Sequence, residues 1–446
     1  MDTILITVDA LRADHLSQYG YERETMPVLD DIIEEEATVF ESAFSNGTHT
    51  GISLPSMLTS RYLGDHPATD GPTIATALPD DVTTVGVHSN TYFATRIGRP
   101  AGFDIFEDFD VATSNEDEAV RSTPHRVFRK TMDIVRPTVE RLGIRELAES
   151  AQRAVFPSSL IHESTAYETA ERTTDRALEL VSEVEGDIFL WIHYMDPHRP
   201  FCMHIDDPEF SDAKLSDSEI HTLMSRAGVS PEEVSEENRE LLIDLYDSEL
   251  SYTSEEITRL IDGLEEQNRW KESQVIFTAD HGEEFGEHGY YFHRNRPYDE
   301  LLHVPLITRH PDQPAERITE QRELLDIAPT ICGSHGVGTP ETFIGCDLFN
   351  PGERDVVATG SFRDSVPVIG ARWAGWKFIE AGSEVELYDI RADPTESENI
   401  AEENPERVST FEEAIPERLY QEDHSAVPTN ESEEVNKRLE NLGYLE

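Results

Sequence analysis

Short apolar runs separated by polar turns recur along most of the 446-residue chain, with longer stretches of helical pattern between them. The runs are nearly continuous and rich in β-branched residues, which is typical of strands covered on both faces. The expected strands are Thr3–Val8, Val82–His88, Asp187–His193, Gln274–Thr278 and Val304–Thr308. The expected helices are Met26–Glu36, Pro55–Ser60, Tyr167–Val184, Glu240–Leu264 and Leu324–Gly333.

This alternation of strands and helices predicts an α/β fold with a mostly parallel, doubly wound sheet over residues 1–335. The pattern changes over residues 336–446, where short strands follow one another closely and predict a small antiparallel sheet. Those strands are Val356–Thr359, Val368–Arg372, Lys377–Glu380 and Glu386–Tyr388. Two helical patterns follow, near 405–420 and 432–441, so the second unit is expected to be a small α+β subdomain.

The net charge of the chain indicates the kind of solvent around the protein and does not change the predicted fold. Asp and Glu number 91 against 36 Lys and Arg, a net charge of −55, and only five of the basic residues are lysine. Such a surface repels itself unless counterions screen it, and at molar salt the Debye length is only about 3 Å. We therefore expect a halophilic, archaeal type of protein with a salt-rich cytoplasm around it. A globally basic surface for nucleic acid is excluded.

One stretch runs against this trend. Arg121–Arg153 holds more basic than acidic residues, within a segment near 112–165 that we expect to be a helical insertion. Packing against an acidic face of the same molecule is the favoured interpretation, and binding of an anionic ligand is the alternative.

The chain also lacks the marks of secretion or membrane insertion. Its three cysteines are too few and too scattered for a disulfide framework or a metal knot. The opening MDTILITVDA reads as a strand rather than a signal peptide, and no apolar run approaches 18 residues. We expect a cytoplasmic protein without a transmembrane segment.

Polar residues with metal-binding chemistry stand where two expected strands end. Asp9 follows the first strand, and Asp280 and His281 follow a later one. Ligands of open α/β sheets bind outside the carboxyl ends of the strands, so these three side chains are expected to converge. Two carboxylates and an imidazole suit one divalent cation, Ca²⁺, Mg²⁺ or Mn²⁺, with Zn²⁺ as a further candidate.

Three histidines and two hydroxyl groups complete the candidate site. His193 and His198 flank a third strand end in FLWIHYMDPHRPF, and His293 lies in GYYFHRN. They are suitable donors for an oxyanion or a leaving group. In residues 45–64, a proline that can begin a helix places Thr50 and Ser53 near a helix N-terminus. Either hydroxyl is a candidate nucleophile, and helix capping is the alternative role.

Taken together, these motifs resemble the sulfatase family of the alkaline phosphatase superfamily. The resemblance rests on ordered blocks that include VDALRADHLSQYGY, FLWIHYMDPHRPF, FTADHGEEFGEHG, YDELLHVPLI and ELYDIRADPTESENIAEENPE. It implies an alkaline-phosphatase-like α/β/α sandwich and metal-dependent hydrolysis of sulfate or phosphate esters. It also implies metal ligands at Asp9, Asp280 and His281, and substrate-contacting or proton-donating roles for His198 and His293. His193 and Ser53 are expected to bind substrate.

The chain departs from the family pattern at two places. The segment that would hold the family's C/S-x-P-S-R has no cysteine, so a formylglycine is not expected. Thr50 is the favoured nucleophile because the downstream LTSR then falls in register, whereas a Ser53 frame loses the arginine to Met57. The family's paired Asp-Asp is Asp9-Ala10 here, so the metal has one fewer carboxylate.

Three functions are consistent with these sequence features. The first is a metal-dependent ester hydrolase that forms a covalent intermediate on Thr50 and takes a small-molecule or glycan ester. The second is a phosphoethanolamine-type phosphotransferase, and the third is a catalytically inactive anion-binding relic. The missing cysteine favours phosphate over sulfate. The oligomeric state stays open.

Overall fold

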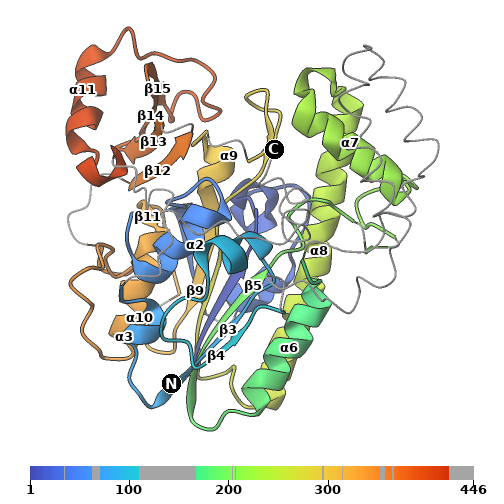
Figure 1. Cartoon of the computed structure of the whole chain (residues 1–446), viewed down its shortest axis with the longest axis vertical. Coiled ribbons are helices and arrows are strands. Elements are labelled where there is room, and N and C mark those ends of the chain that lie inside the picture. The colour runs from blue at the N-terminus through green and yellow to red at the C-terminus, as the bar shows by residue number, and fades with distance from the viewer. Residues whose placement is uncertain are drawn as a thin grey trace, which may run out of the picture.

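A central sheet with helices on both faces forms the larger part of the protein, and a smaller sheet lies beside it (Figure 1). The computed structural model describes residues 1–34, 36–62, 71–109, 167–202, 204–205, 207–293, 296–313, 315–351, 357–363 and 366–420. The expected insertion near 112–165, the basic stretch Arg121–Arg153 and the second terminal helix near 432–441 lie outside these described residues.

The central sheet has nine strands within the described chain, in the order β10-β2-β9-β6-β1-β5-β3-β4, with β11 also paired to β2. Its strands are β1 Thr3–Val8, β2 Thr38–Phe44, β3 Val82–Val87, β4 Ile105–Glu107, β5 Asp187–Tyr194, β6 Gln274–Ala279, β9 His303–Arg309, β10 Arg317–Ile318 and β11 Arg322–Glu323. β1 lies between β5 and β6 and pairs with both in parallel. The expected mostly parallel sheet is therefore confirmed.

Apart from the short strands β4, β10 and β11, which were not predicted, two features of this sheet differ from the sequence prediction. β9 is antiparallel to both of its neighbours, β2 and β6, so the run at Val304–Thr308 is not one of the parallel strands. Strand β2 was not expected at all. Its apolar pattern is interrupted at Glu41 and Ser42, which are half-buried, and its register with β9 shifts between Phe40 and Ala43. A bulge of this kind breaks the alternation by which a strand is recognised.

Two groups of helices cover the sheet. The helices of the main unit are α1 Val28–Glu34, α2 Thr50–Thr59, α3 Ile74–Ala77, α6 Ala170–Ser182, α7 Asp217–Val229, α8 Glu236–Glu266, α9 Asp299–Leu302 and α10 Ile327–Ser334. In Figure 1, α6 and α8 lie on one face while α2, α3 and α10 lie on the other. The central strands are buried between these layers, and every residue of β1 is inaccessible to solvent.

The C-terminal unit contains the expected antiparallel sheet. Its strands pair in chain order and are β12 Val357–Arg363, β13 Val366–Trp373, β14 Trp376–Ala381 and β15 Glu384–Asp389. Helix α11, Pro405–Ala414, confirms the first of the two terminal helices and packs Phe411 against Phe378 of the sheet. This unit has its own apolar cluster, although Tyr62 and Leu325 of the main unit join it. The boundary at residues 335 and 336 stays a prediction.

The cysteines and the lengths of the helices bear on two further expectations. Cys202 and Cys332 are buried free thiols, and Cys346 is half-buried. Among the residues that the structure describes, none of the helices combines the length and the apolar character needed to cross a membrane.

Candidate active site

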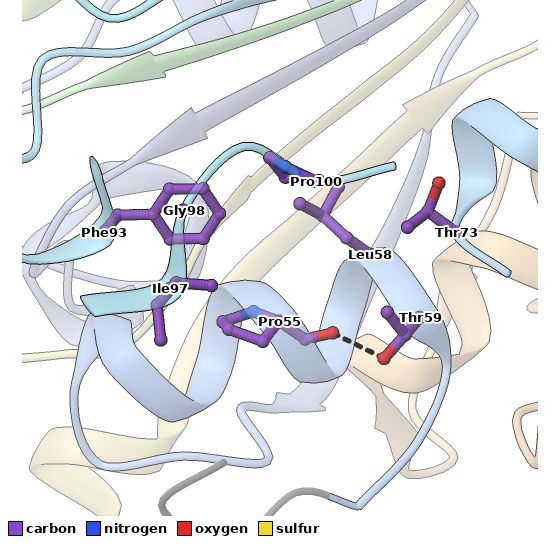
Figure 2. Close-up of a pocket in the computed structure, with 8 residues that line it drawn as sticks. All are labelled: Pro55, Leu58, Thr59, Thr73, Phe93, Ile97, Gly98 and Pro100. Atoms are coloured by element: carbon purple, nitrogen blue, oxygen red, sulfur yellow. Dashed lines mark hydrogen bonds between the residues drawn. The ribbon is translucent and has the colours of Figure 1, made fainter. Parts of the chain in front are cut away.

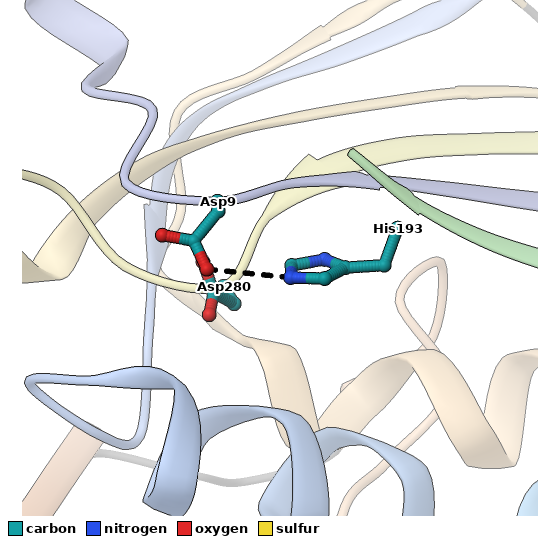
Figure 3. A group of neighbouring side chains, drawn as sticks. All are labelled: Asp9, His193 and Asp280. Carbon is teal, nitrogen blue, oxygen red and sulfur yellow. Dashed lines mark ion pairs between the residues drawn. The ribbon is translucent and has the colours of Figure 1, made fainter. Parts of the chain in front are cut away.

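The carboxyl ends of β1, β5 and β6 place three side chains in one buried position. Asp9 follows β1, Asp280 follows β6 and His193 lies near the end of β5, and all three are fully buried (Figure 3). Ala10 adopts a left-handed conformation with φ of 55°, and its N–H donates to Asp280 Oδ1 over 3.3 Å. The same oxygen accepts from the N–H of His281 at 2.9 Å, so Asp280 is fixed through Oδ1.

These groups face one another closely enough to hold one cation. One ligand atom each from Asp9, His193 and Asp280 lie within 4.8 Å of one another. His193 Nε2 is 3.3 Å from Asp9 Oδ2, and His281 Nε2 is 3.6 Å from Asp280 Oδ2. In the described part of the chain, Asp9 Oδ1 has no hydrogen-bond partner. Two buried carboxylates with an unsatisfied oxygen fit a divalent cation, because burial without one is costly.

The ring orientation of His281 supports the same interpretation. Its Nδ1 lies 2.7 Å from the carbonyl oxygen of Gly282, which can only accept a hydrogen bond, so Nδ1 carries a proton. In the neutral imidazole, Nε2 then presents a lone pair toward Asp9 and Asp280. This orientation, fixed by a backbone carbonyl, is common among metal-ligating histidines.

The ring of His193 is oriented in a similar way through Thr7. The Thr7 hydroxyl donates to the carbonyl of Ile192 at 3.2 Å and accepts from the indole of Trp191 at 3.1 Å. His193 Nδ1 is 2.9 Å from that hydroxyl oxygen and therefore donates to it. In the neutral ring, the lone pair of Nε2 faces the Asp9 carboxylate, an unfavourable contact that a cation between them would relieve. His193 was expected to bind substrate, and its position also makes it a candidate metal ligand.

Helix α2 brings both candidate nucleophiles to the carboxylates. Thr50 Oγ1 donates to Asp9 Oδ2 at 3.0 Å and lies 3.3 Å from His281 Nε2. Ser53 Oγ donates to Asp280 Oδ2 over 3.5 Å. Both hydroxyl residues are buried. Of the two, Thr50 lies nearer to the groups expected to hold the metal.

The start of α2 corrects the sequence prediction. The helix begins at Thr50 and contains Pro55, whereas the sequence suggested that Pro55 would begin it. His49 caps the helix instead, since its Nδ1 accepts the N–H of Gly51 at 3.1 Å. The predicted placement of Thr50 near a helix N-terminus therefore holds, because the helix starts earlier than expected.

His198 and His293 lie next to this group. Their ring centroids are 5.4 Å apart, and the His293 ring is 5.2 Å from that of His281. Burial lowers the pKa of His198 to about 4, although the negative charge of Asp9 opposes this shift. Burial, together with the neighbouring His281 and His198, lowers the pKa of His293 well below its usual value. The structure therefore brings all eight expected side chains to the same end of the sheet.

Asn90 is a neighbour of the site that the sequence analysis did not identify. Its Nδ2 lies 3.5 Å from Asp9 Oδ2, and its Oδ1 accepts from the N–H of Phe93 at 2.8 Å. Asn90 follows strand β3 in the sequence VGVHSN. It could have been found by the rule used for Asp9 and Asp280, that ligands bind at the carboxyl ends of the strands (the strand-end rule).

A small pocket lies between α2 and the segment near Pro100 (Figure 2). Apolar side chains such as Leu58, Phe93 and Ile97 line most of it, and Thr59 Oγ1 donates to the carbonyl of Pro55 at 2.7 Å. Among the residues that the structure describes, its lining contains neither a carboxylate nor a histidine.

Comparison with known proteins identifies the class to which this fold and site belong. The model of the Sulfatase family matches residues 2–337, more than half of the chain. The chain therefore belongs to the sulfatase family, as the motifs suggested.

Two curated proteins of different activities are similar to parts of this chain. The chain is 26% identical over 244 residues to the choline-sulfatase of Rhizobium meliloti (strain 1021), covering 48% of this chain and 46% of that protein. It is 23% identical over 296 residues to the phosphatidylethanolamine transferase Mcr-1 of Escherichia coli, covering 65% of this chain and 44% of that protein. The chain thus spans about half the length of the curated relatives it matches.

Solved structures agree over a larger part of the chain and show the fold. The structure of BT4656 with its substrate D-glucosamine-2-N,6-O-disulfate gives a TM-score of 0.67 at 17% identity, covering 94% of this chain and 98% of that one. The phosphonate monoester hydrolase of Agrobacterium radiobacter gives 0.65 at 16% identity, covering 93% and 94%. The expected alkaline-phosphatase-like fold is confirmed.

Proposed function

We propose that this protein is a metal-dependent hydrolase of sulfate or phosphate esters that uses Thr50 as its nucleophile. The observation that carries this proposal is the position of the Thr50 hydroxyl, which donates to buried Asp9 at 3.0 Å and lies 3.3 Å from His281 Nε2. Membership of the sulfatase family supports the reaction class. The absence of a cysteine in residues 45–64 supports a plain hydroxyl rather than a formylglycine.

Asp9, Asp280 and His281 are the proposed metal ligands, and His193 is a candidate fourth ligand because its Nε2 faces Asp9. Ca²⁺, Mg²⁺ and Mn²⁺ suit the carboxylates, and the imidazoles extend the choice to Zn²⁺. A divalent cation held there would supply positive charge to the ester oxygens and favour ionisation of a neighbouring hydroxyl.

The side chains of this protein divide the reaction between them. Thr50 Oγ1 forms a bond to the sulfur or phosphorus while the bond from that atom to the ester oxygen breaks. The proton that leaves the Thr50 hydroxyl ends on the departing alcohol. His198 and His293 lie close enough together to contact one group. Their lowered pKa values leave both rings neutral near pH 7, so they relay this proton to the alcohol rather than supply one of their own. Water then cleaves the Thr50 ester, releasing sulfate or phosphate and restoring the hydroxyl. Ser53 contacts the substrate beside them.

Phosphotransfer is the second candidate function. The similarity to the phosphatidylethanolamine transferase Mcr-1 over 65% of the chain favours it. The same Thr50 intermediate would then pass its group to an acceptor alcohol instead of water. The product formed in the presence of a polyol distinguishes transfer from hydrolysis.

The substrate is proposed as a small-molecule or glycan ester, with phosphate favoured over sulfate because the cysteine is missing. The proposed setting is a salt-rich cytoplasm, for which the net charge of −55 is the support. A proposed division at residues 335 and 336 places every catalytic side chain in the first domain, consistent with the family match ending at residue 337.

A substrate panel in molar KCl tests the proposal. Aryl sulfate, phosphate monoester, phosphodiester and phosphonate monoester would each be assayed with Ca²⁺, Mg²⁺, Mn²⁺ and Zn²⁺ in turn. We expect turnover of at least one ester class, abolished by chelation and lowered roughly 10³-fold in Asp280→Asn. Asp262→Asn removes an exposed carboxylate from α8 and is the matched control. Absence of turnover together with absence of divalent-cation binding by calorimetry would instead support an inactive relic.

A further inference from the structure

A second cluster of metal-binding side chains lies where the loop after β5 meets α8, and the proposed reaction does not use it. It consists of Asp196 and His204 from the loop and Glu249 from the middle of α8. One ligand atom from each lies within 4.8 Å of the other two. His204 Nε2 is 3.2 Å from Asp196 Oδ1 and 3.6 Å from Glu249 Oε2.

The burial and hydrogen bonding of this cluster point to a missing ligand. Asp196 and Glu249 are 0% exposed, and the His204 side chain is 15% exposed. Within the described ranges, Asp196 Oδ2, Glu249 Oε2 and His204 Nε2 are buried and make no hydrogen bond. These three unsatisfied atoms belong to one small cluster. Two carboxylates buried this deeply are unfavourable unless a positive charge lies between them.

The remaining oxygens of the two carboxylates hold the side chains in place. Asp196 Oδ1 accepts from the N–H of Ala170 at 2.9 Å. Glu249 Oε1 accepts from the N–H of Cys202. Each carboxylate is therefore fixed through one oxygen and keeps its second oxygen for a further partner. A cluster whose ligands are already oriented binds a cation without the cost of ordering them.

We propose that Asp196, His204 and Glu249 form a second cation site that binds a divalent transition metal, with Zn²⁺ the best fit. One imidazole nitrogen and two carboxylate oxygens are a ligand set that Zn²⁺ and Mn²⁺ accept, whereas Mg²⁺ and Ca²⁺ prefer oxygen alone. The partial exposure of His204 leaves a path from solvent for the metal and for a water molecule as further ligand. The proposal does not depend on which reaction the first site performs.

Such a metal would fasten the loop after β5 to α8. Other contacts already join the two elements, since Cys202 Sγ donates to the carbonyl of Leu245 at 3.2 Å and Phe201 packs against Tyr246. His198 lies in this loop, and its N–H donates to the carbonyl of Met195 at 2.9 Å. The second site would therefore act on the reaction as a positioning device for His198.

Cobalt binding tests the proposal in a protein whose first site has been disabled. Metal-free Asp9→Asn/Asp280→Asn would be titrated with Co²⁺ in 2 M KCl, which suppresses weak binding to surface carboxylates, and followed by visible absorption and metal analysis. We expect this double variant to retain one Co²⁺ that Zn²⁺ displaces and that equimolar Mg²⁺ does not. Adding His204→Gln should raise the dissociation constant by at least about 100-fold.

The controls distinguish two sources of positive charge in the cluster, a bound metal ion and a proton shared between its side chains. His221→Gln on α7 removes an exposed histidine and should leave binding unchanged. If His204→Gln fails to fold by circular dichroism, Glu249→Gln replaces it, because the amide oxygen can still accept from Cys202. Equal Co²⁺ affinity with and without these substitutions would overturn the proposal. So would the absence of bound Co²⁺ in the double variant, which would mean that a protonated His204 alone balances the two carboxylates.

Discussion

At the scale of single residues, the hydroxyl groups of Thr50 and Ser53 differ in what they face. The Thr50 hydroxyl contacts both Asp9 and His281, whereas the Ser53 hydroxyl donates to Asp280 at the longer distance of 3.5 Å. We expect Thr50→Ala to lower kcat/KM at least about 10³-fold, because loss of the nucleophile removes the covalent step. Ser53→Ala should lower it less than about tenfold. Steady-state kinetics at saturating metal in molar KCl measures both.

Thr50→Ser is the control for this comparison. It keeps a hydroxyl group on Cβ and should retain part of the activity. Circular dichroism should show that all three variants remain folded. Full turnover in Thr50→Ala, together with inactivity of Ser53→Ala, would show that Ser53 is the nucleophile.

At the level of single residues, the parts of the site that could be predicted are those that directly follow a strand. Asp9 and Asp280 each end a recognisable apolar run, and parallel strands put such ends at one edge. The orientation of His193 could not be predicted, because it depends on Thr7, its partner in the pairing of β1 with β5. That pairing follows from the order of the strands in the sheet, which a single sequence does not contain.

At the scale of elements, α2 shows why boundaries were harder to predict than the elements themselves. Proline is favoured in the first turn of a helix, and this preference led to a predicted start at Pro55. The true start depends on His49, which is not a common capping residue, and on the buried environment of the whole helix. Tertiary packing thus decided the helix start where the local preference pointed elsewhere.

The C-terminal sheet is joined to the main unit by a buried ion network around Lys377. Lys377 of β14 is 0% exposed, and its Nζ lies 2.8 Å from Asp299 Oδ1 and 3.4 Å from Glu396 Oε1. Asp299 begins α9, shortly after the segment that carries His293. Lys377 is thus the cation between two carboxylates at the junction of the two units.

We expect Lys377→Met to lower the free energy of unfolding by about 3 kcal/mol, because it leaves buried Glu396 without its cation and removes one of the two cations from half-buried Asp299. Urea unfolding in constant molar KCl, followed by fluorescence, measures the change. Lys214→Met removes an exposed lysine and should change the free energy by less than about 0.5 kcal/mol. Equal stabilities of the two variants would mean that Arg372, which also pairs with Asp299, is sufficient at this junction.

At the scale of the whole molecule, dissolved salt affects the net charge of −55 and the buried site differently. The carboxylates of the candidate site are fully buried, so dissolved ions screen them poorly. The remaining surplus of negative charge repels itself and repels an anionic ester that approaches the protein. Raising the salt from 0.1 M to 1 M shortens the Debye length from about 10 Å to about 3 Å and weakens both repulsions.

We therefore expect ester turnover to rise with KCl concentration up to the molar range. Most of the effect should appear as a lower KM, because screening acts on the encounter between two negatively charged partners. Kinetics from 0.1 M to 3 M KCl would test this, with thermal unfolding measured in the same buffers to separate folding from catalysis. Sucrose at matched osmolality is the control, since it favours the compact state without screening charge. Maximal activity in salt-free buffer would contradict the interpretation of the acidic composition as adaptation to salt.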